Sequence, residues 1–358
     1  MSKQEPGPTP PITEEKLGKA LELYDELMEM DNSRLRNRLH RTFAQKRSSR
    51  RRRIIAASCA AAVVLPLLVL GGLRLFTQGG FGGGSAPEVW SSESVLLTLS
   101  DGNSITLDRI SDDGTVADDD GALFLTRDGL LTVEKKGGYD EPAEIRNHTV
   151  YVPKGKQYDM MLEDGTRVWL NSDSRVRFPS VFGNGERRVE IEGEVYFQVR
   201  ADAARPFVVE AGGQEVTVLG TEFNVAAYPE DALILTTLVS GKVSVANGHG
   251  METILRPNEQ AEFDRTSKGI SVREVNAPDV AAWKDGFFAF DENTLEQVLQ
   301  KLSRWYNIEV SFRDESLKSI MFKGTLPKFD DVERVLGFIE KSGTVKFDLR
   351  GNRVIVSK

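Results

Sequence analysis

Few residues have types and spacings that could support chemistry. Glu192 and Glu194 lie two positions apart, so they share one face of a predicted strand, and a pair of carboxylates is what glycoside hydrolysis requires. A solvent-facing strand surface is the simpler interpretation of the same pair. Asp118-Asp119-Asp120-Gly121 offers carboxylates to calcium, but its spacing does not match an EF-hand loop, which favours an acidic turn.

Other catalytic and metal-binding patterns are missing from the sequence. The only cysteine is Cys59, and the three histidines, His40, His148 and His249, are far apart, so no Cys/His metal spacing exists. No G-x-S-x-G nucleophile motif occurs either. We therefore predict a protein that is not an enzyme and that needs no metal and no cofactor.

The residues from Val89 to about Val275 follow a β pattern. Asp-Gly pairs flanked by alternating apolar residues recur at Asp101-Gly102, Asp128-Gly129 and Asp164-Gly165, and such pairs favour the positive φ of tight hairpins. The clearest strand alternates apolar and polar positions, with one side formed by Val189, Ile191, Gly193, Val195, Phe197 and Val199 and the other by Glu190, Glu192, Glu194, Tyr196 and Gln198. Many short strands without intervening helices predict an all-β domain, either a sandwich or a solenoid-like stack.

After the junction at 278–285 the spacing of the apolar residues along the chain changes. Phe287–Phe290 is predicted to be a strand, and Asn293 is predicted to cap a helix, with Glu296 completing a capping box. The apolar pattern then recurs at an offset of 37, since Leu295, Val298, Leu299, Leu302, Ile308, Val310 and Phe312 correspond to Val332, Val335, Leu336, Ile339, Val345, Phe347 and Leu349. This repetition predicts a small α+β domain with two β-α-β repeats. Trp305 and Phe338 are assigned to its core, with a contact surface as the alternative.

A run of 20 uncharged, mostly apolar residues, 54–73, is long enough to cross a bilayer as a helix. Arg50 to Arg53 precede it directly, and the positive-inside rule then places residues 1–53 in the cytoplasm and the rest in the periplasm. The full chain has a net charge of −8. Residues 1–53 carry 13 Lys/Arg against 8 Asp/Glu, about +5, which leaves −13 for the remainder and gives no reason to expect nucleic acid there.

The first 53 residues contain two short amphipathic patterns. Leu17, Leu21, Tyr24 and Met28 form one stripe, and Leu35, Leu39 and Phe43 form a second. Such stripes must be buried against each other, the membrane or a partner. A helical hairpin at the lipid headgroups, a partner-binding module and a DNA-binding segment all remain open, although no helix-turn-helix pattern supports the last.

The β-rich stretch resembles the FecR family of transmembrane anti-sigma regulators over roughly residues 150–245. The resemblance begins with Val152-Pro153-Lys154-Gly155 and continues through Gly193-Glu194-Val195-Tyr196-Phe197 to Val218–Val225. The motif residues are Asp164, Gly165, Trp169, Leu170, Asn171, Gly193, Glu194, Phe197, Gly220, Thr221, Phe223, Asn224 and Val225. The last domain is similar in position and topology to the C-terminal domain of such regulators, which itself resembles the short N-terminal domain of secretins and TonB-dependent receptors.

The resemblance implies a transmembrane anti-sigma factor. Its partners would be an extracytoplasmic-function sigma factor in the cytoplasm and the periplasmic signalling domain of a TonB-dependent outer-membrane receptor. We expect the sigma factor to contact Leu17, Leu21, Tyr24, Met28, Leu35, Leu39 and Phe43. Whether the inner region restrains or helps to activate the sigma factor is left open by the sequence.

We therefore predict a single-pass inner-membrane protein in five parts. They are a cytoplasmic helical segment (1–53), a transmembrane helix (54–73), a glycine-rich linker (74–88), a periplasmic β-rich domain (89–283) and a C-terminal α+β domain (284–358). The alternative is a membrane-tethered periplasmic adaptor or glycan-binding protein without a role in transcription.

Overall fold

A computed structural model describes residues 93–110, 114–119, 121–127, 129–136, 146–329 and 331–358. The predicted inner helices, membrane span and glycine-rich linker lie outside the described residues, as does Asp120 of the acidic turn. None of the helices in the described ranges has the length and apolar character that a membrane crossing requires.

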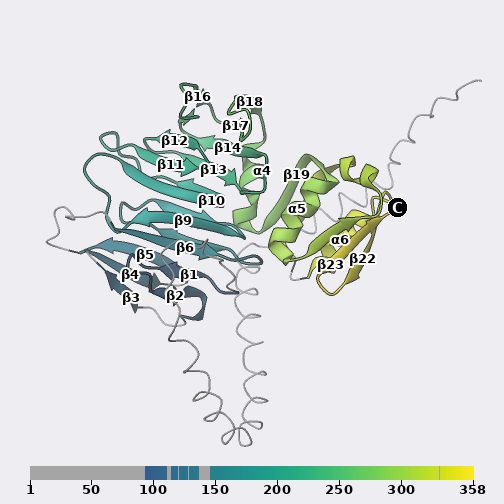
Figure 1. The fold of residues 1–358 in the computed structure, drawn as a ribbon, viewed down its shortest axis with the longest axis horizontal. Coiled ribbons are helices and arrows are strands. Elements are labelled where there is room, and N and C mark those ends of the chain that lie inside the picture. Colours follow the sequence, from purple (N-terminus) through teal and green to yellow (C-terminus); the bar gives the residue numbers. More distant parts are fainter. Residues whose placement is uncertain (1–92, 111–113, 120, 128, 137–145, 330) are drawn as a thin grey trace, which may run out of the picture. The chain divides into compact units, whose positions relative to one another are not determined.

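A large β domain forms the first part of the described chain (Figure 1). Its strands are β1 (Leu96–Thr98), β2 (Ser104–Thr106), β3 (Gly114–Asp119), β4 (Ala122–Arg127), β5 (Leu130–Lys135), β6 (Asn147–Val152), β7 (Tyr158–Met161), β8 (Arg167–Leu170), β9 (Ser174–Pro179), β10 (Arg187–Gln198), β11 (Phe207–Ala211), β12 (Gln214–Val218), β13 (Glu222–Ala227), β14 (Leu233–Ser240), β15 (Val243–Ala246), β16 (Glu252–Leu255), β17 (Glu259–Asp264) and β18 (Ile270–Glu274), with a 3₁₀ turn η1 (Leu107–Arg109).

These strands form one continuous 18-stranded sheet that folds close to a barrel. One half has the order β2-β1-β6-β9-β10-β11-β12-β15-β16, and the other has β3-β4-β5-β7-β8-β10-β13-β14-β17-β18. Figure 1 shows this order as a stack from β2 and β3 at one end to β16 and β18 at the other. Strand β10 belongs to both halves, because Glu190–Glu192 pair with β9 and Val195–Gln198 pair with β8.

The alternation predicted from the sequence defines the core between the two halves. Val189, Ile191, Val195 and Phe197 of β10 are all buried in one large apolar cluster with residues from both halves of the sheet. The three Asp-Gly hairpins are confirmed, with Gly102, Gly129 and Gly165 at φ values of 88°, 79° and 85°. Local turn chemistry therefore sets the strand boundaries, as expected.

A short connection leads into the C-terminal domain. It consists of α4 (Ala277–Ala281) and a 3₁₀ turn η2 (Ala282–Asp285), and the domain itself contains β19 (Phe287–Thr294), α5 (Leu295–Tyr306), β20 (Glu309–Phe312), a 3₁₀ turn η3 (Glu315–Ser319), β21 (Met321–Pro327), α6 (Val332–Glu340), β22 (Lys346–Arg350) and β23 (Arg353–Ser357). Strands β19 and β21 form an antiparallel pair, and β20-β23-β22 form a separate three-stranded sheet.

The repeated apolar pattern becomes two strand–helix–strand units, β19-α5-β20 and β21-α6-β22. The stripes of α5 and α6 are buried in a second apolar cluster, which includes Leu295, Leu302, Val335 and Ile339. The first and last strand of each unit lie in different sheets. The predicted combination of a large β domain and a small C-terminal α+β domain is confirmed.

The predicted cap of α5 is wrong by one residue. Thr294, not Asn293, accepts the helix N–H of Gln297 at 3.3 Å, and the Gln297 side chain accepts the Thr294 N–H at 3.0 Å. Thr294 still pairs with Met321 in the β19–β21 ladder, so the strand, predicted to end at Phe290, runs to Thr294 and the helix begins one residue later than predicted. The Asn293 side chain instead accepts the N–H of Asp291.

Candidate functional site

Three of the motif residues meet on neighbouring strands at one side of the β domain. Asn171 follows β8, Glu194 lies on β10 and Asn224 lies on β13. The Glu194 carboxylate accepts the Asn171 amide at 2.8 Å and the Asn224 amide at 3.0 Å, one at each oxygen. The side-chain oxygen Oδ1 of Asn224 in turn accepts the indole N–H of Trp283 at 3.0 Å. The motif residues of the β domain therefore hold the connection to the C-terminal domain.

The predicted solvent-facing surface of β10 is partly covered. Tyr196 is only 3% exposed and forms a small apolar cluster with Ala281 and Trp283, with Trp169 packed against it. Its ring meets the Trp169 ring edge-on at 5.4 Å. The prediction of a water-facing surface is wrong at Tyr196, because η2 lies over this part of the strand. Glu192 does face outward, where it pairs with Arg175.

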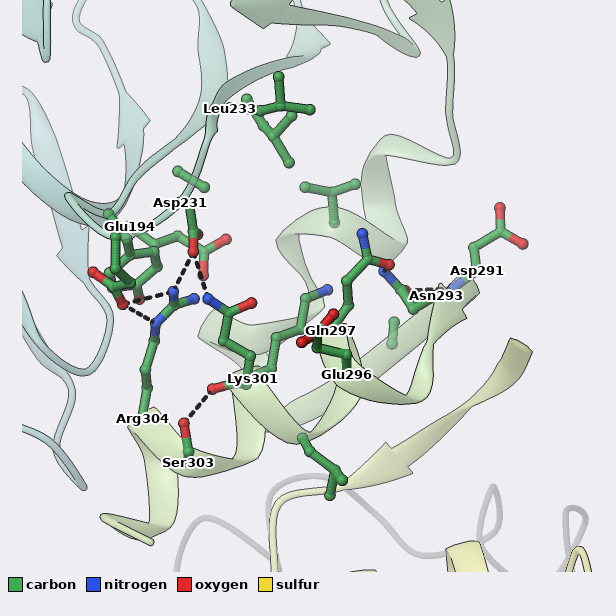
Figure 2. Close-up of a pocket in the computed structure, with 18 of the residues that line it drawn as sticks. Glu194, Asp231, Leu233, Asp291, Asn293, Glu296, Gln297, Lys301, Ser303 and Arg304 are labelled. Atoms are coloured by element: carbon green, nitrogen blue, oxygen red, sulfur yellow. Dashed lines mark hydrogen bonds and ion pairs between the residues drawn. The ribbon is translucent and has the colours of Figure 1, made fainter. Parts of the chain in front are cut away.

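The centre of the contact between the two domains is Arg304, at the C-terminal end of α5. Its guanidinium donates to Glu230 at 2.8 Å and to Asp231 at 2.7 Å, and its Cζ atom lies 3.6 Å from the centroid of the Tyr228 ring. Tyr228 is buried and donates its hydroxyl to the carbonyl of Ser172 at 2.9 Å. Figure 2 shows Arg304 reaching from α5 towards Asp231.

A cavity of about 730 Å³ lies beside this ion-pair cluster. It is lined from the β domain by Glu194, Asp231 and Leu233 among others, and from α5 by Gln297 and Lys301. In Figure 2, Lys301 points into the space between α5 and Leu233. The residues that join the two domains, Glu230, Asp231 and Arg304, thus also line this open volume.

Lys328 makes a second set of contacts across the same boundary. Its ammonium nitrogen lies 3.8 Å from the centroid of the Trp305 ring and 5.7 Å from that of Trp283, and it donates to Gln157 at 3.4 Å. Burial lowers the pKa of Lys328 to about 7, while the Glu194 carboxylate opposes that shift. The aromatic faces attract the charged ammonium group, whereas burial disfavours the charged form, so the two effects on the Lys328 side chain oppose each other.

We expect this lysine to make stability depend on pH. Between pH 7 and 10.5 the unfolded chain binds the proton that folded Lys328 has lost, so stability rises with pH in this window. The thermal midpoint of the purified chain should therefore rise from pH 7 to pH 9, and Lys328→Met should flatten that rise. The exposed Lys323→Met is the control and should keep the wild-type slope. Equal slopes for wild type and Lys328→Met would contradict the assignment.

A second group of motif residues is structural. Asp164 accepts the N–H of Thr166 at 2.9 Å, the hydroxyl of Thr166 at 2.7 Å and the Arg187 guanidinium at 2.7 Å. Arg187 is completely buried and also donates to the carbonyls of Arg200 and Arg205. This network ties the β7–β8 turn to the start of β10 and to the loop that follows β10.

The remaining motif residues form the core and the tight turns of the β domain. Leu170, Phe197, Phe223 and Val225 are fully buried. Gly165, Gly193 and Gly220 have positive φ values, and the Thr221 hydroxyl donates to the carbonyl of Lys242. These positions shape the fold without facing the boundary between the domains. The inner residues expected to contact a sigma factor, Leu17, Leu21, Tyr24, Met28, Leu35, Leu39 and Phe43, lie outside the described residues.

Residues that matter at the boundary were missed from the sequence. Tyr228, Glu230, Asp231 and Arg304 belong to no motif, and Arg304 lies off the apolar stripe of its helix. Trp305 was assigned to the core with a contact surface as the alternative, and it packs against the second apolar cluster.

Comparisons with known proteins agree with this architecture. A family model described as "FecR protein" matches residues 148–244, and one described as "FecR, C-terminal" matches residues 287–356. Two crystal structures of "a putative anti-sigma factor from Parabacteroides distasonis ATCC 8503" are 32% identical to this chain, each with a TM-score of 0.55. The matches cover 59% of this chain and 98% and 99% of those chains. No curated protein matches the chain.

These matches place the protein among regulators of transcription and not among enzymes. The chain belongs to the FecR family of anti-sigma factors and carries the FecR C-terminal domain. The resemblance stated from the sequence and the prediction of a non-enzymatic protein are both confirmed.

Proposed function

We propose that this chain is a single-pass inner-membrane regulator that carries a signal from the periplasm to a sigma factor. Residues 1–53 bind an extracytoplasmic-function sigma factor in the cytoplasm, and residues 54–73 cross the membrane. A glycine-rich linker (74–88) leads to the β-rich domain (89–283) and the α+β domain (284–358) in the periplasm. These last two domains receive the signal from the periplasmic signalling domain of a TonB-dependent outer-membrane receptor.

One observation carries the proposal: both FecR modules follow the apolar run in order along the chain. Four arginines precede that run, and an excess of positive charge on one side orients a membrane helix with that side inward. The similarity to a structure described as an anti-sigma factor supports a sigma factor as the cytoplasmic partner. The two short apolar stripes of residues 1–53 supply a surface that needs such a partner for its burial.

The test is co-purification of the sigma factor with the full-length chain. Leu21→Asp combined with Tyr24→Asp places two charges in the centre of the first stripe and should reduce the bound sigma factor at least about tenfold, because burying charges without partners costs more than about 1.4 kcal/mol. Lys19→Asp is the matched control. It changes the net charge by the same amount on the opposite face of the predicted helix, so it should bind normally.

Undiminished binding by the double variant would reject this surface as the sigma-factor site. Transcript profiling after deletion of the gene separates the proposal from its alternative. A changed set of sigma-dependent transcripts supports a regulator, and the direction of change distinguishes restraint from activation. An unchanged transcriptome would favour a membrane-tethered adaptor or glycan-binding protein.

A further inference from the structure

The β domain and the C-terminal domain have separate apolar cores. The cluster that fills the β domain and the cluster around α5 and α6 share no residue. Only a small group, Tyr196, Ala281 and Trp283 with Trp169 and Val239, bridges the connection between them. Each domain therefore keeps its own core when the other moves, and interfaces between such domains are commonly polar and open to relative motion.

Most of the remaining contacts between the domains converge on one arginine. The guanidinium of Arg304 enters a socket formed by Glu230, Asp231 and the ring of Tyr228, and the Arg304 side chain is 9% exposed. The backbone carbonyl of Arg304 accepts the N–H of Gly155 at 3.0 Å. One residue of the C-terminal domain thus engages two separate loops of the β domain, the 153–157 turn and the 228–231 loop.

The neighbouring contacts are polar as well. Gln300 donates to Asp231 at 2.6 Å, and Gln157 donates to the backbone carbonyl of Lys284 at 3.3 Å. The cavity of about 730 Å³ is lined by Glu230, Asp231 and Arg304 themselves, so open volume borders the ion pairs between the domains. An ion pair taken out of water gains less than its attraction suggests, because desolvation offsets much of the gain. The complete contact therefore adds little net stability, and removing one partner leaves the other charge without its counter-ion, which favours undocking.

From these contacts we infer that the C-terminal domain is a reversibly docked lid on the β domain, and that insertion of Arg304 into the Tyr228–Glu230–Asp231 socket is the latch that holds it closed. Breaking this latch frees the C-terminal domain to move about the end of the connection that follows Trp283, while both cores stay folded. The role of the latch in signalling rests on the proposed function.

The experiment measures docking in the full-length chain reconstituted in lipid nanodiscs. Cys59→Ser removes the native thiol, and Glu252→Cys and Lys346→Cys place one spin label on exposed positions of β16 and β22. The wild-type background should give one narrow distance by pulsed electron resonance, and Arg304→Ala should add a broad, longer-distance population. Arg353→Ala is the matched control, because it breaks an exposed ion pair with Glu309 inside the C-terminal domain and should leave the distance unchanged.

Hydrogen exchange supplies a second readout and tests for folding. The Gly155 amide, which is bonded to the Arg304 carbonyl, should exchange at least about tenfold faster in Arg304→Ala than in Arg353→Ala. Amides of β13 and α6 should stay protected, which shows that both domains remain folded. Arg304→Lys keeps a positive charge beside Glu230 and Asp231 and should retain the narrow distance. An unchanged distance and exchange rate in Arg304→Ala would overturn the latch, and so would loss of protection throughout both domains.

A sigma-dependent reporter separates this inference from the proposed function. A reporter response to Arg304→Ala but not to Arg353→Ala supports the latch as part of the signal path. If Arg304→Ala opens the lid without changing the reporter while Leu21→Asp/Tyr24→Asp does change it, the proposed function stands and the signalling role of the latch is rejected. If neither variant changes the reporter, the proposed function fails, and an opened lid still establishes the docking contact.

Discussion

Replacing Arg187 with methionine should lower the free energy of unfolding of the β domain by roughly 3–5 kcal/mol, because Asp164 then stays buried without its charge partner. The carbonyls of Arg200 and Arg205 lose their donor as well. The methionine side chain is similar in length to that of arginine. The loss of stability therefore reflects the missing charge and hydrogen bonds more than a cavity. Urea denaturation of the purified chain, with hydrogen exchange of β10 amides, measures the change in the β domain.

Arg177→Met is the matched control for this substitution. Arg177 also forms an ion pair across neighbouring strands, with Glu190 at 3.4 Å, but both side chains are more than half exposed. Exposed pairs contribute roughly 0–1 kcal/mol, so the control should unfold almost as the wild type does. A loss in Arg187→Met no larger than that of the control would show that the buried network does not stabilise the β7–β8 turn.

The second large effect is expected for Gly193→Ala, at the point where β10 passes from one half of the sheet to the other. A Cβ atom there would lie 2.3 Å from Ser174 Oγ, 2.6 Å from the Asp173 carbonyl oxygen and 2.6 Å from Ser174 Cα. Two of these are backbone atoms, which cannot rotate away. With φ at +84° the backbone also disfavours an L side chain. Strain and overpacking together should cost roughly 2–5 kcal/mol.

Gly129→Ala separates the two causes. Gly129 has a similar φ of +79°, but a Cβ atom there would meet nothing within 4 Å. The free energy of unfolding of Gly129→Ala should therefore fall only by the backbone contribution of roughly 1–2 kcal/mol, measured by the same urea titration. If the two alanine variants are equally destabilised, close packing against the β9 start is not what requires glycine at position 193.

The hairpins show which parts of the β domain follow from the sequence. An Asp-Gly pair between alternating residues specifies a turn through the φ preference of its glycine, and Gly102, Gly129 and Gly165 adopt that conformation. The alternation along 189–199 likewise predicts the buried face of β10, because side chains in a strand point to opposite sides. The identity of the pairing partners was beyond prediction, and so was the division of β10 between two halves of the sheet.

The cap of α5 is a place where the capping rule predicts the wrong residue by one position. Asn293 and Thr294 are both good capping residues, and each has a Glu or Gln three positions later. The strand partner Met321 decides between them, because pairing extends β19 to Thr294 and places the helix start after it. Pairing between residues distant in sequence thus decides which of two capping residues with similar local preferences begins the helix.

The sequence by itself determined the family, the β-rich and α+β modules and the repeated α5 and α6 stripes, since each depends on patterns within a few tens of residues. Only the tertiary structure revealed the cover over Tyr196, the Glu194 amide contacts and the Arg304 socket. Arg304 and Glu230 are 74 positions apart. No periodicity links two such residues, because their meeting depends on how two finished domains pack and not on the conformation of either segment.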